Sequence, residues 1–265
     1  MEYIVIILAL ILGTVIGSFL NVVIYRYNTG TTLGGRSMCF SCGTELMWYE
    51  LFPILSFLLL GGRCRTCKSK ISTQYALVEL GTGVLFALLA QTLLPLGIVN
   101  EAFAVWFIFW AVILSILMVI VVYDLKHKII PDGFVYAFAI LSFAHLFFTT
   151  TDFQFVIPPP MSMLAGILIP LPFLLIFIFS QGRLIGFGDI KLMVGIGFAL
   201  GLEKGFSAVF IAFWIGALVS IFLLFLKKGK VTMNTEVPFA PFLVLGMLLV
   251  FFFNVSAFHL FDFVL

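Results

Sequence analysis

The sequence predicts an all-α integral membrane protein with about eight transmembrane helices and a small cysteine-containing insert after the first helix. Of its 265 residues, 63% are hydrophobic and only 10% are charged, whereas soluble domains are roughly half apolar and about a quarter charged. Several apolar runs approach the roughly 20 residues that a helix needs to cross a hydrocarbon core about 30 Å thick. All four cysteines fall in one polar segment between the first two runs.

The predicted membrane spans are residues 3–25, 75–95, 102–123, 133–149, 161–180, 189–202, 206–226 and 237–258. The fourth and sixth are short for a full crossing. An apolar stretch at 51–60 is shorter still, which is typical of soluble core or of an interfacial piece. The N-terminal run lacks a basic flank and a small-residue cleavage site, so we expect a retained first helix.

Basic residues predict the orientation of these spans. If residue 26 onward is cytoplasmic, every one of the 14 lysines and arginines except Lys204 falls on the inner side. The last three of these inner cations are Lys227, Lys228 and Lys230. The positive-inside rule expects this asymmetry, so both termini are expected outside. The net charge of +2 is spread along the inner loops and favours no nucleic-acid partner.

Composition divides the chain into a first transmembrane helix at 1–25, a cytoplasmic insert at 26–74 and a helical bundle at 75–265. The first helix carries Gly13, Gly17 and Asn21 at four-residue spacing. Small and polar residues on one stripe allow another helix to approach closely and to form interhelical hydrogen bonds. We therefore expect this stripe to be a packing surface.

Two CxxC pairs in the insert predict a metal site. The cysteines are Cys39, Cys42, Cys64 and Cys67, and 21 residues separate the two pairs, slightly more than the usual spacing for four-cysteine zinc sites. The nearby cations that would stabilise thiolates are Arg36, Arg63, Arg65 and Lys68. The alternative is two local disulfides or redox-active pairs, which a reducing cytoplasm disfavours. Four thiolates leave no open coordination position, so we expect structural zinc.

Three acidic residues near predicted helix ends need separate interpretations. Asp124 ends the third predicted helix, where an inner loop begins. Asp132 follows Pro131 and is expected to be an N-cap, because a short carboxylate satisfies free N–H groups at a helix start. Glu79 lies about one turn inside the second helix, and carboxylates within a membrane are usually functional, but the sequence names no partner for it.

Asp189, in the sequence GFGD, has two interpretations. It is either an N-cap or one half of a pair with Asp124, which the predicted topology puts at the same cytoplasmic edge. Two adjacent carboxylates share a proton, so one activates a water while the other polarises a carbonyl, and together they hydrolyse a peptide bond. Gly186 and Gly188 leave room for a substrate strand. Lys191 either lowers the pKa of an aspartate or, as we favour, snorkels to the headgroups.

These motifs resemble those of the bacterial type IV prepilin peptidases, membrane aspartyl proteases of the GxGD type that also N-methylate the mature pilin. The resemblance covers nearly the whole chain, and its motifs follow the family's order. They are GSFLNVVIYR (17–26), WYELFPILSFLLLGGRCRTC (48–67), DLKHKIIPD (124–132), GFGDIKL (186–192) and PFAPFLVLG (238–246).

The resemblance implies that Asp124 and Asp189 are the catalytic pair of a peptidase domain at 75–265. It implies a substrate from a type IV pilus or type II secretion system, a prepilin or pseudopilin with a short basic leader that is cut after a glycine, at the cytoplasmic face of the bacterial inner membrane. It also implies zinc on the four cysteines, and S-adenosylmethionine as methyl donor to the new N-terminus, commonly a phenylalanine. The chain has no glycine-rich fingerprint for this donor, so the sequence assigns no residues to its site, and the insert at 26–74 is only the suspected location.

Two segments depart from the family's pattern, and two other functions share some of its features. Leu51-Phe52-Pro53 stands where the family often has Asn-Ile-Pro, in the part associated with methylation, and Ala240 replaces a glycine in Pro-Phe-Gly-Pro. A presenilin-like intramembrane protease shares the aspartate pair but lacks the cysteine insert. An ion-coupled transporter would use both aspartates near the midplane, whereas both lie at the predicted inner boundary.

Overall fold

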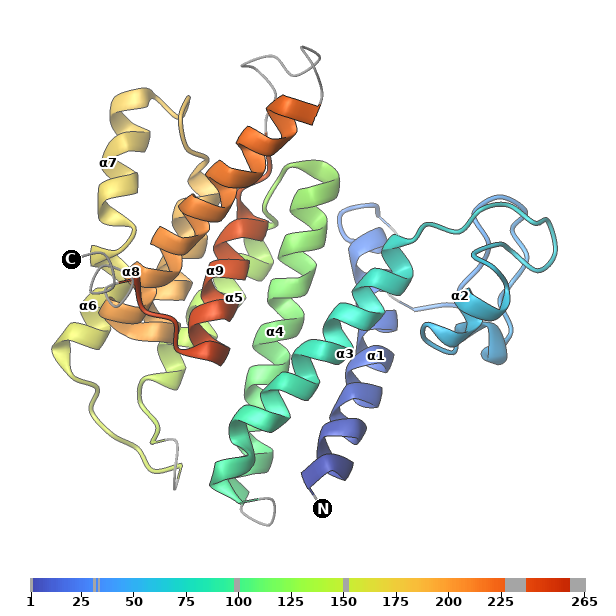
Figure 1. Cartoon of the computed structure of the whole chain (residues 1–265), viewed down its shortest axis with the longest axis horizontal. Coiled ribbons are helices and arrows are strands. Elements are labelled where there is room, and N and C mark those ends of the chain that lie inside the picture. Colours follow the sequence, from blue (N-terminus) through green and yellow to red (C-terminus); the bar gives the residue numbers. More distant parts are fainter. Residues whose placement is uncertain are drawn as a thin grey trace. The chain divides into compact units, whose positions relative to one another are not determined.

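The computed structural model describes residues 2–30, 32, 34–97, 101–149, 153–226 and 237–257. The lysines at 227, 228 and 230 that enter the orientation argument lie outside these ranges. Within them the chain is helical and contains isolated β-bridges but no β-strand. Figure 1 shows the helices coloured in chain order.

The α-helices are α1 (Glu2–Arg26), α2 (Leu55–Leu59), α3 (Gln74–Leu93), α4 (Glu101–His127), α5 (Asp132–His145), α6 (Pro160–Leu168), α7 (Leu171–Ser180), α8 (Phe187–Leu226) and α9 (Ala240–Phe253), and the 3-10 helices are η1 (Trp48–Leu51) and η2 (Leu94–Leu96). Five helical stretches of the described chain are long and apolar enough to cross a membrane, and α5 and α9 are shorter apolar helices. The prediction of an all-α, multi-pass membrane protein is confirmed.

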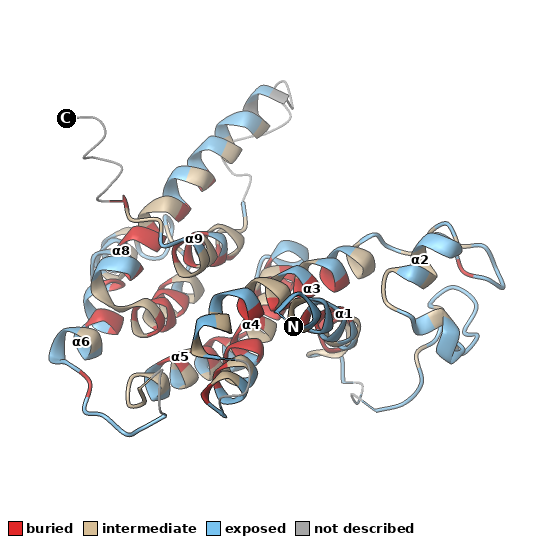
Figure 2. Ribbon diagram, turned by 60° about the horizontal axis from the view of Figure 1, so that its bottom comes forward, coloured by how far each residue is buried: buried red, intermediate tan, exposed pale blue. Residues whose placement is uncertain are grey.

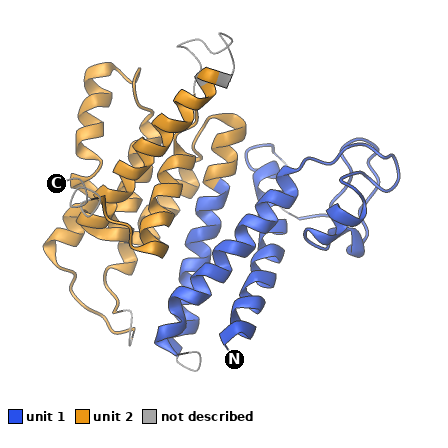
Figure 3. Ribbon diagram, viewed as in Figure 1, with its two compact units in different colours: residues 1–119 blue, residues 120–265 orange. Residues whose placement is uncertain are grey.

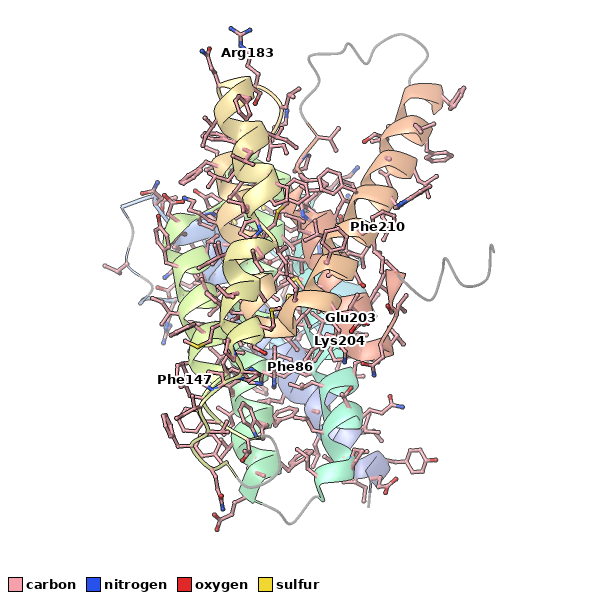
Figure 4. All side chains as sticks on the ribbon, turned by 90° about the vertical axis from the view of Figure 1, so that its left-hand side faces the viewer. Phe86, Phe147, Arg183, Glu203, Lys204 and Phe210 are labelled. Atoms are coloured by element: carbon pink, nitrogen blue, oxygen red, sulfur yellow. The ribbon has the colours of Figure 1, made fainter. Side chains whose placement is uncertain are left out.

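Helix α8 contains both the sixth and the seventh predicted spans. Its 40 residues are interrupted at Gly201, where φ is 75° and ψ is −177°. A Cβ atom added to Gly205 would lie 3.5 Å from the Cα of Gly197, whereas eight residues of straight helix span about 12 Å. The chain therefore turns back at Gly201, and Figure 4 shows this turn beside the labelled Glu203 and Lys204.

The fifth predicted span is also divided, into α6 and α7. The break falls at Ile169 and Pro170, between the end of α6 and the start of α7. Proline has no N–H to donate to the preceding turn and its ring crowds that turn, so a helix breaks there.

The chain forms two compact units, residues 1–119 and 120–265 (Figure 3). In the first unit, α1 packs against α3 at the predicted glycine stripe. A Cβ on Gly13 would lie 2.6 Å from the carbonyl oxygen of Thr82, and one on Gly17 would lie 2.7 Å from the Cα of Glu79. Asn21 donates from Nδ2 to the carbonyl oxygen of Tyr75 at 3.2 Å. The packing interpretation of this stripe is confirmed.

In the second unit, α8 is the central helix. It packs against α5, α6 and α9, and its buried positions lie on the faces that meet these neighbours (Figure 2). Small residues again set the closest approach, because a Cβ on Gly197 would lie 2.6 Å from the carbonyl oxygen of Ala165 in α6. This packing holds the first turn of α8, which contains Asp189, against the elements around it.

Candidate active site and metal site

The structure brings the two predicted aspartates together in the second unit. Asp124 lies in the last turn of α4 and Asp189 in the first turn of α8. Asp124 is only 4% exposed, and Asp189 is half-buried. The two carboxylates interact electrostatically. A pair of acidic groups therefore occupies one site, although 65 positions separate them in the sequence.

Each carboxylate is held by one backbone N–H group. The N–H of Ala240, at the start of α9, donates to Asp124, and the N–H of Gly186 donates to Asp189. The other oxygens, Oδ2 of Asp124 and Oδ1 of Asp189, are buried and have no hydrogen-bond partner within the described residues. Buried acceptors without partners destabilise a fold, so they mark oxygen atoms that a ligand can engage.

The capping interpretation put Asp189 at the wrong position relative to the start of its helix. Helix α8 begins at Phe187, so Asp189 is the third residue of the helix and is not its N-cap. Its carboxylate reaches back to the N–H of Gly186, in the manner of the acidic residue of a capping box. Asp132 is likewise the first residue of α5, after the N-cap Pro131, because boundaries inferred from sequence shift by one or two residues.

Lys191 forms an ion pair with Asp132. Its side chain is 15% exposed, and its Nζ lies 5.3 Å from the ring centroids of both Tyr136 and Phe187. The structure therefore places this ammonium between α5 and α8. Its expected contact with lipid headgroups stays a prediction. The pair joins the start of one helix to the start of the other.

Both predicted glycines have a packing role inside the protein. A Cβ on Gly188 would lie 3.0 Å from the Cβ of Ile130, in the segment that leads into α5. A Cβ on Gly186 would lie 3.2 Å from Oδ2 of Asp189. Gly188 therefore permits the close approach of α8 to this segment, and Gly186 leaves room for the carboxylate.

The four cysteines of the first unit form a cluster that could hold a metal ion. Their sulfur atoms all lie within 4.8 Å of one another, and all four are free. The Sγ atoms of Cys39 and Cys67 are 3.8 Å apart. Four sulfurs placed tetrahedrally at about 2.3 Å from a zinc ion are also about 3.8 Å from one another. The sulfur arrangement therefore fits one tetrahedral ion.

Two turns of matching geometry present these sulfurs. Cys39 N–H donates to Thr44 and Gly43 N–H donates to Cys39 in the first turn, and Cys64 N–H donates to Ser69 and Lys68 N–H donates to Cys64 in the second. Gly43 and Lys68 occupy the same place in their turns, with φ of 70° and 57°. The cluster is thus built from two copies of one backbone motif.

Hydrogen bonds favour the thiolate form of two of these cysteines. The backbone N–H groups of Cys42 and Ser41 are the main cause that lowers the pKa of Cys39 to about 6. The hydroxyl of Ser69 lies 3.1 Å from the sulfur of Cys67 and lowers the pKa of that thiol. Because the thiolate is the form that binds metal, these hydrogen bonds prepare Cys39 and Cys67 for a cation.

Comparisons with known proteins identify the family of the chain. The chain matches the model of the Bacterial Peptidase A24 N-terminal domain over residues 11–93 and that of the Type IV leader peptidase family over residues 111–221. A prepilin leader peptidase/N-methyltransferase of Bacillus subtilis (strain 168) is 31% identical over 257 residues, which cover 93% of either chain. The chain belongs to the prepilin leader peptidase/N-methyltransferase family.

Another member of this prepilin leader peptidase/N-methyltransferase family, from Vibrio cholerae serotype O1, is 29% identical over 265 residues, or 95% of this chain and 98% of its own. A Klebsiella pneumoniae member is 30% identical over 200 residues, or 72% and 83%. No solved structure matches the chain. Family membership disfavours the presenilin-like protease and the ion-coupled transporter.

Each candidate site of this family member falls in a different matched region. The cysteines fall within residues 11–93, and both aspartates fall within residues 111–221. The sequence did not predict the pairing of Lys191 with Asp132. Its only signal was that both residues were expected at the cytoplasmic edge of the membrane. It also missed Ser69, although a hydroxyl residue follows the second cysteine of each pair by two positions.

Proposed function

We propose that this chain cleaves the leader peptide of type IV prepilins and pseudopilins and then N-methylates the new N-terminal residue. The observation that carries the first activity is the interacting pair of Asp124 and Asp189, each with one buried oxygen that lacks a partner within the described residues. The names of the relatives, which combine leader peptidase and N-methyltransferase, support both activities.

Cleavage proceeds through the two carboxyl groups. They hold one proton between them, because like charges in a half-buried site cannot both ionise readily. The ionised carboxylate takes a proton from a water molecule, which attacks the scissile carbonyl carbon, while the protonated carboxyl donates a hydrogen bond to the carbonyl oxygen. The tetrahedral product then collapses as a proton passes from a carboxyl group to the leaving nitrogen and the C–N bond breaks.

The substrate of this reaction is a prepilin or pseudopilin with a short basic leader. Cleavage after a glycine at the cytoplasmic face of the bacterial inner membrane follows from the family's motifs, and it agrees with an acidic site at helix ends. The insert at 26–74 and the two aspartates lie on the cytoplasmic side, as the distribution of Lys and Arg favours. The peptidase domain occupies 75–265, after the first transmembrane helix (1–25) and the insert.

The second reaction belongs to the cytoplasmic insert. S-adenosylmethionine would supply the methyl group there, and the new α-amine would accept it and lose a proton. Cys39, Cys42, Cys64 and Cys67 would hold zinc in a structural role, because four thiolates would fill its coordination shell. Those thiolates fix the two turns of the insert relative to each other, and the insert is the proposed N-methyltransferase part.

Incubation of the detergent-solubilised protein with a prepilin, with and without S-adenosylmethionine, tests this function. Asp124→Asn and Asp189→Asn each remove the group that moves a proton, so we expect cleavage to fall by about 10²- to 10⁴-fold. Glu203→Gln is the matched control, because Glu203 is exposed and lies just after the turn at Gly201, at the far end of the stretch of α8 that begins beside Asp189. Undiminished cleavage by either aspartate variant would contradict the pair.

A second substrate separates the two activities. Mature pilin with a free N-terminus bypasses cleavage, and we expect both asparagine variants to methylate it at the wild-type rate. If methylation of this substrate is lost together with cleavage, the two activities do not have separate sites.

A further inference from the structure

An apolar segment of the insert, residues 48–60, carries large side chains that the protein leaves uncovered. It comprises η1, α2 and the residues that join and follow them. Trp48 is 73% exposed, Leu55 is 60% exposed and Leu59 is 86% exposed. Within 48–60 every residue is exposed or half-buried, as Figure 2 shows for α2. The soluble-core interpretation of this stretch is therefore wrong, since its apolar side chains do not face a core.

The segment is tied to a membrane-spanning helix at a defined depth. The backbone N–H of Ile54 donates to Oε2 of Glu79 at 2.7 Å. Glu79 is buried, at 7% exposure, and it lies five residues after Gln74, where α3 begins. At about 1.5 Å of rise per residue, this places the bond about 8 Å along the helix from its end. A boundary between headgroups and acyl chains lies at such a depth.

The backbone at this tie is strained. Ile54 has φ 59° and ψ −49°, and the N–H of Leu55 donates to the carbonyl oxygen of Pro53, two residues earlier. This is the rare γ-turn with positive φ at its centre. A β-branched residue keeps such a conformation only where its surroundings impose it. Glu79 accepts the N–H of the strained residue itself and so supplies that restraint, and Ser18 of α1 bonds to the same carboxyl group.

Large apolar side chains are also exposed on the two long helices of this unit. Phe19 of α1 and Leu77 of α3 are exposed on helices that are apolar enough to cross a membrane. Leu77 precedes Glu79 by only two residues and lies at nearly the same depth. Aromatic side chains such as Trp48 concentrate at the membrane interface, and Arg65, which contacts Tyr49, offers a cation to anionic headgroups.

We propose that residues 48–60 form an interfacial segment that rests in the lipid of one leaflet, and that Glu79 holds it at that depth through the backbone of Ile54. The bilayer is the partner. Trp48 lies at the level of the headgroups and the leucines of α2 contact the upper acyl chains. Glu79 is a positioning residue in this arrangement.

Tryptophan fluorescence in nanodiscs of phosphatidylcholine and phosphatidylglycerol tests the lipid contact. The emission of Trp48 is obtained as the difference between the wild-type protein and Trp48→Phe. We expect lipids brominated near the top of the acyl chain to quench this emission and aqueous iodide to leave it nearly unchanged. Quenching by iodide without quenching by brominated lipid overturns the proposal, and so does protection from iodide that appears only when a prepilin is added.

Variants of Glu79 test the positioning role with the same readout. Glu79→Ala removes the acceptor of the Ile54 N–H, so we expect Trp48 to lose most of its quenching by brominated lipid and to become accessible to iodide. Glu79→Gln keeps a carbonyl oxygen at this place and should retain the wild-type quenching. Gln91→Ala, at an exposed position of the same helix, is the matched control. Wild-type quenching in Glu79→Ala overturns the role of Glu79.

Discussion

Lys191 donates to the carboxylate of Asp132 across 59 positions of the sequence. Each residue is near one aspartate of the proposed active site in the sequence. Lys191 follows Asp189 by two residues, and Asp132 follows Asp124 by eight. The ion pair therefore connects the two segments that carry the catalytic candidates. Its ammonium is largely enclosed, whereas the carboxylate is 64% exposed.

Separating this ion pair should lower cleavage more than it lowers stability. Asp132→Ala and Lys191→Ala each free one segment, and displacement of a reacting group by about 1 Å can cost about 10²-fold in rate. The pair itself contributes only about 0.5–1 kcal/mol to the free energy of unfolding, because one partner is exposed. Rates of prepilin cleavage by the wild type, the two single variants and the double variant give a double-mutant cycle, which measures the coupling between the two residues.

The exchanged pair, Asp132→Lys with Lys191→Asp, is the control for this cycle. It restores opposite charges in reversed positions, so we expect it to recover part of the cleavage that either single exchange loses. Strictly additive losses in the cycle would show that the pair does not connect the two segments.

Metal removal should affect the insert and spare the peptidase domain. We expect zinc in the reduced, purified protein, and we expect Cys39→Ser or Cys64→Ser to lose it, because three thiolates no longer fill a tetrahedral site. The insert then becomes sensitive to trypsin at Arg63 and Arg65, while cleavage of prepilin continues. Ser41→Ala is the control within the first turn, since only its backbone N–H serves Cys39. Reduced protein without zinc would contradict the assignment.

Lys68→Gly should strengthen metal retention. Lys68 has φ 57° where the matching turn has Gly43, and a left-handed conformation costs a residue with a Cβ about 1 kcal/mol relative to glycine. We expect zinc to dissociate about five-fold more slowly into a chelator, as this free energy implies. Lys68→Ala removes the same charge but keeps a Cβ, so it should release zinc at the wild-type rate. Equal gains from both substitutions would point to charge instead of backbone conformation.

Two glycines of α8 should respond differently to alanine. A methyl group at Gly197 would lie 2.6 Å from the carbonyl oxygen of Ala165, whereas one at Gly216 would lie 3.4 Å from its nearest neighbour, on Phe242. We expect Gly197→Ala to lower the free energy of unfolding by about 1–3 kcal/mol through overpacking, and Gly216→Ala to leave it nearly unchanged. Unfolding in mixed detergent measures both values, and a similar loss in the two variants would contradict the packing of α8 against α6.

The membrane class and the meeting of Asp124 with Asp189 could be predicted because both follow from one-dimensional patterns. The length of an apolar run identifies a membrane span, and the distribution of Lys and Arg assigns each end of a span to one side of the membrane. Two residues assigned to the same edge can then be expected to meet. The GFGD sequence marks the helix start only approximately, which is why the capping interpretation put Asp189 at the N-cap instead of at the third helical position.

Contacts between distant segments could not be predicted in the same way. The partner of Glu79 is a backbone N–H, and every residue except proline has one, so composition carries no signal for Ile54. The partner of Lys191 is an aspartate whose local pattern already had a sufficient explanation as a cap. The bounds of the sixth and seventh predicted spans left their connection at 203–205, but the turn occurs at Gly201, where the backbone conformation is one that glycine adopts most readily.

The turn at Gly201 also bears on how many times α8 is expected to cross the membrane. A straight helix of 40 residues would extend about 60 Å, twice the thickness of a hydrocarbon core of about 30 Å. By turning back, the chain divides α8 between the two expected spans, 189–202 and 206–226, so that Ala240, whose N–H holds Asp124, is expected on the side from which α8 departs. With an odd number of crossings, Ala240 would end on the opposite face of the membrane, and the proposed active site would lose one of its walls.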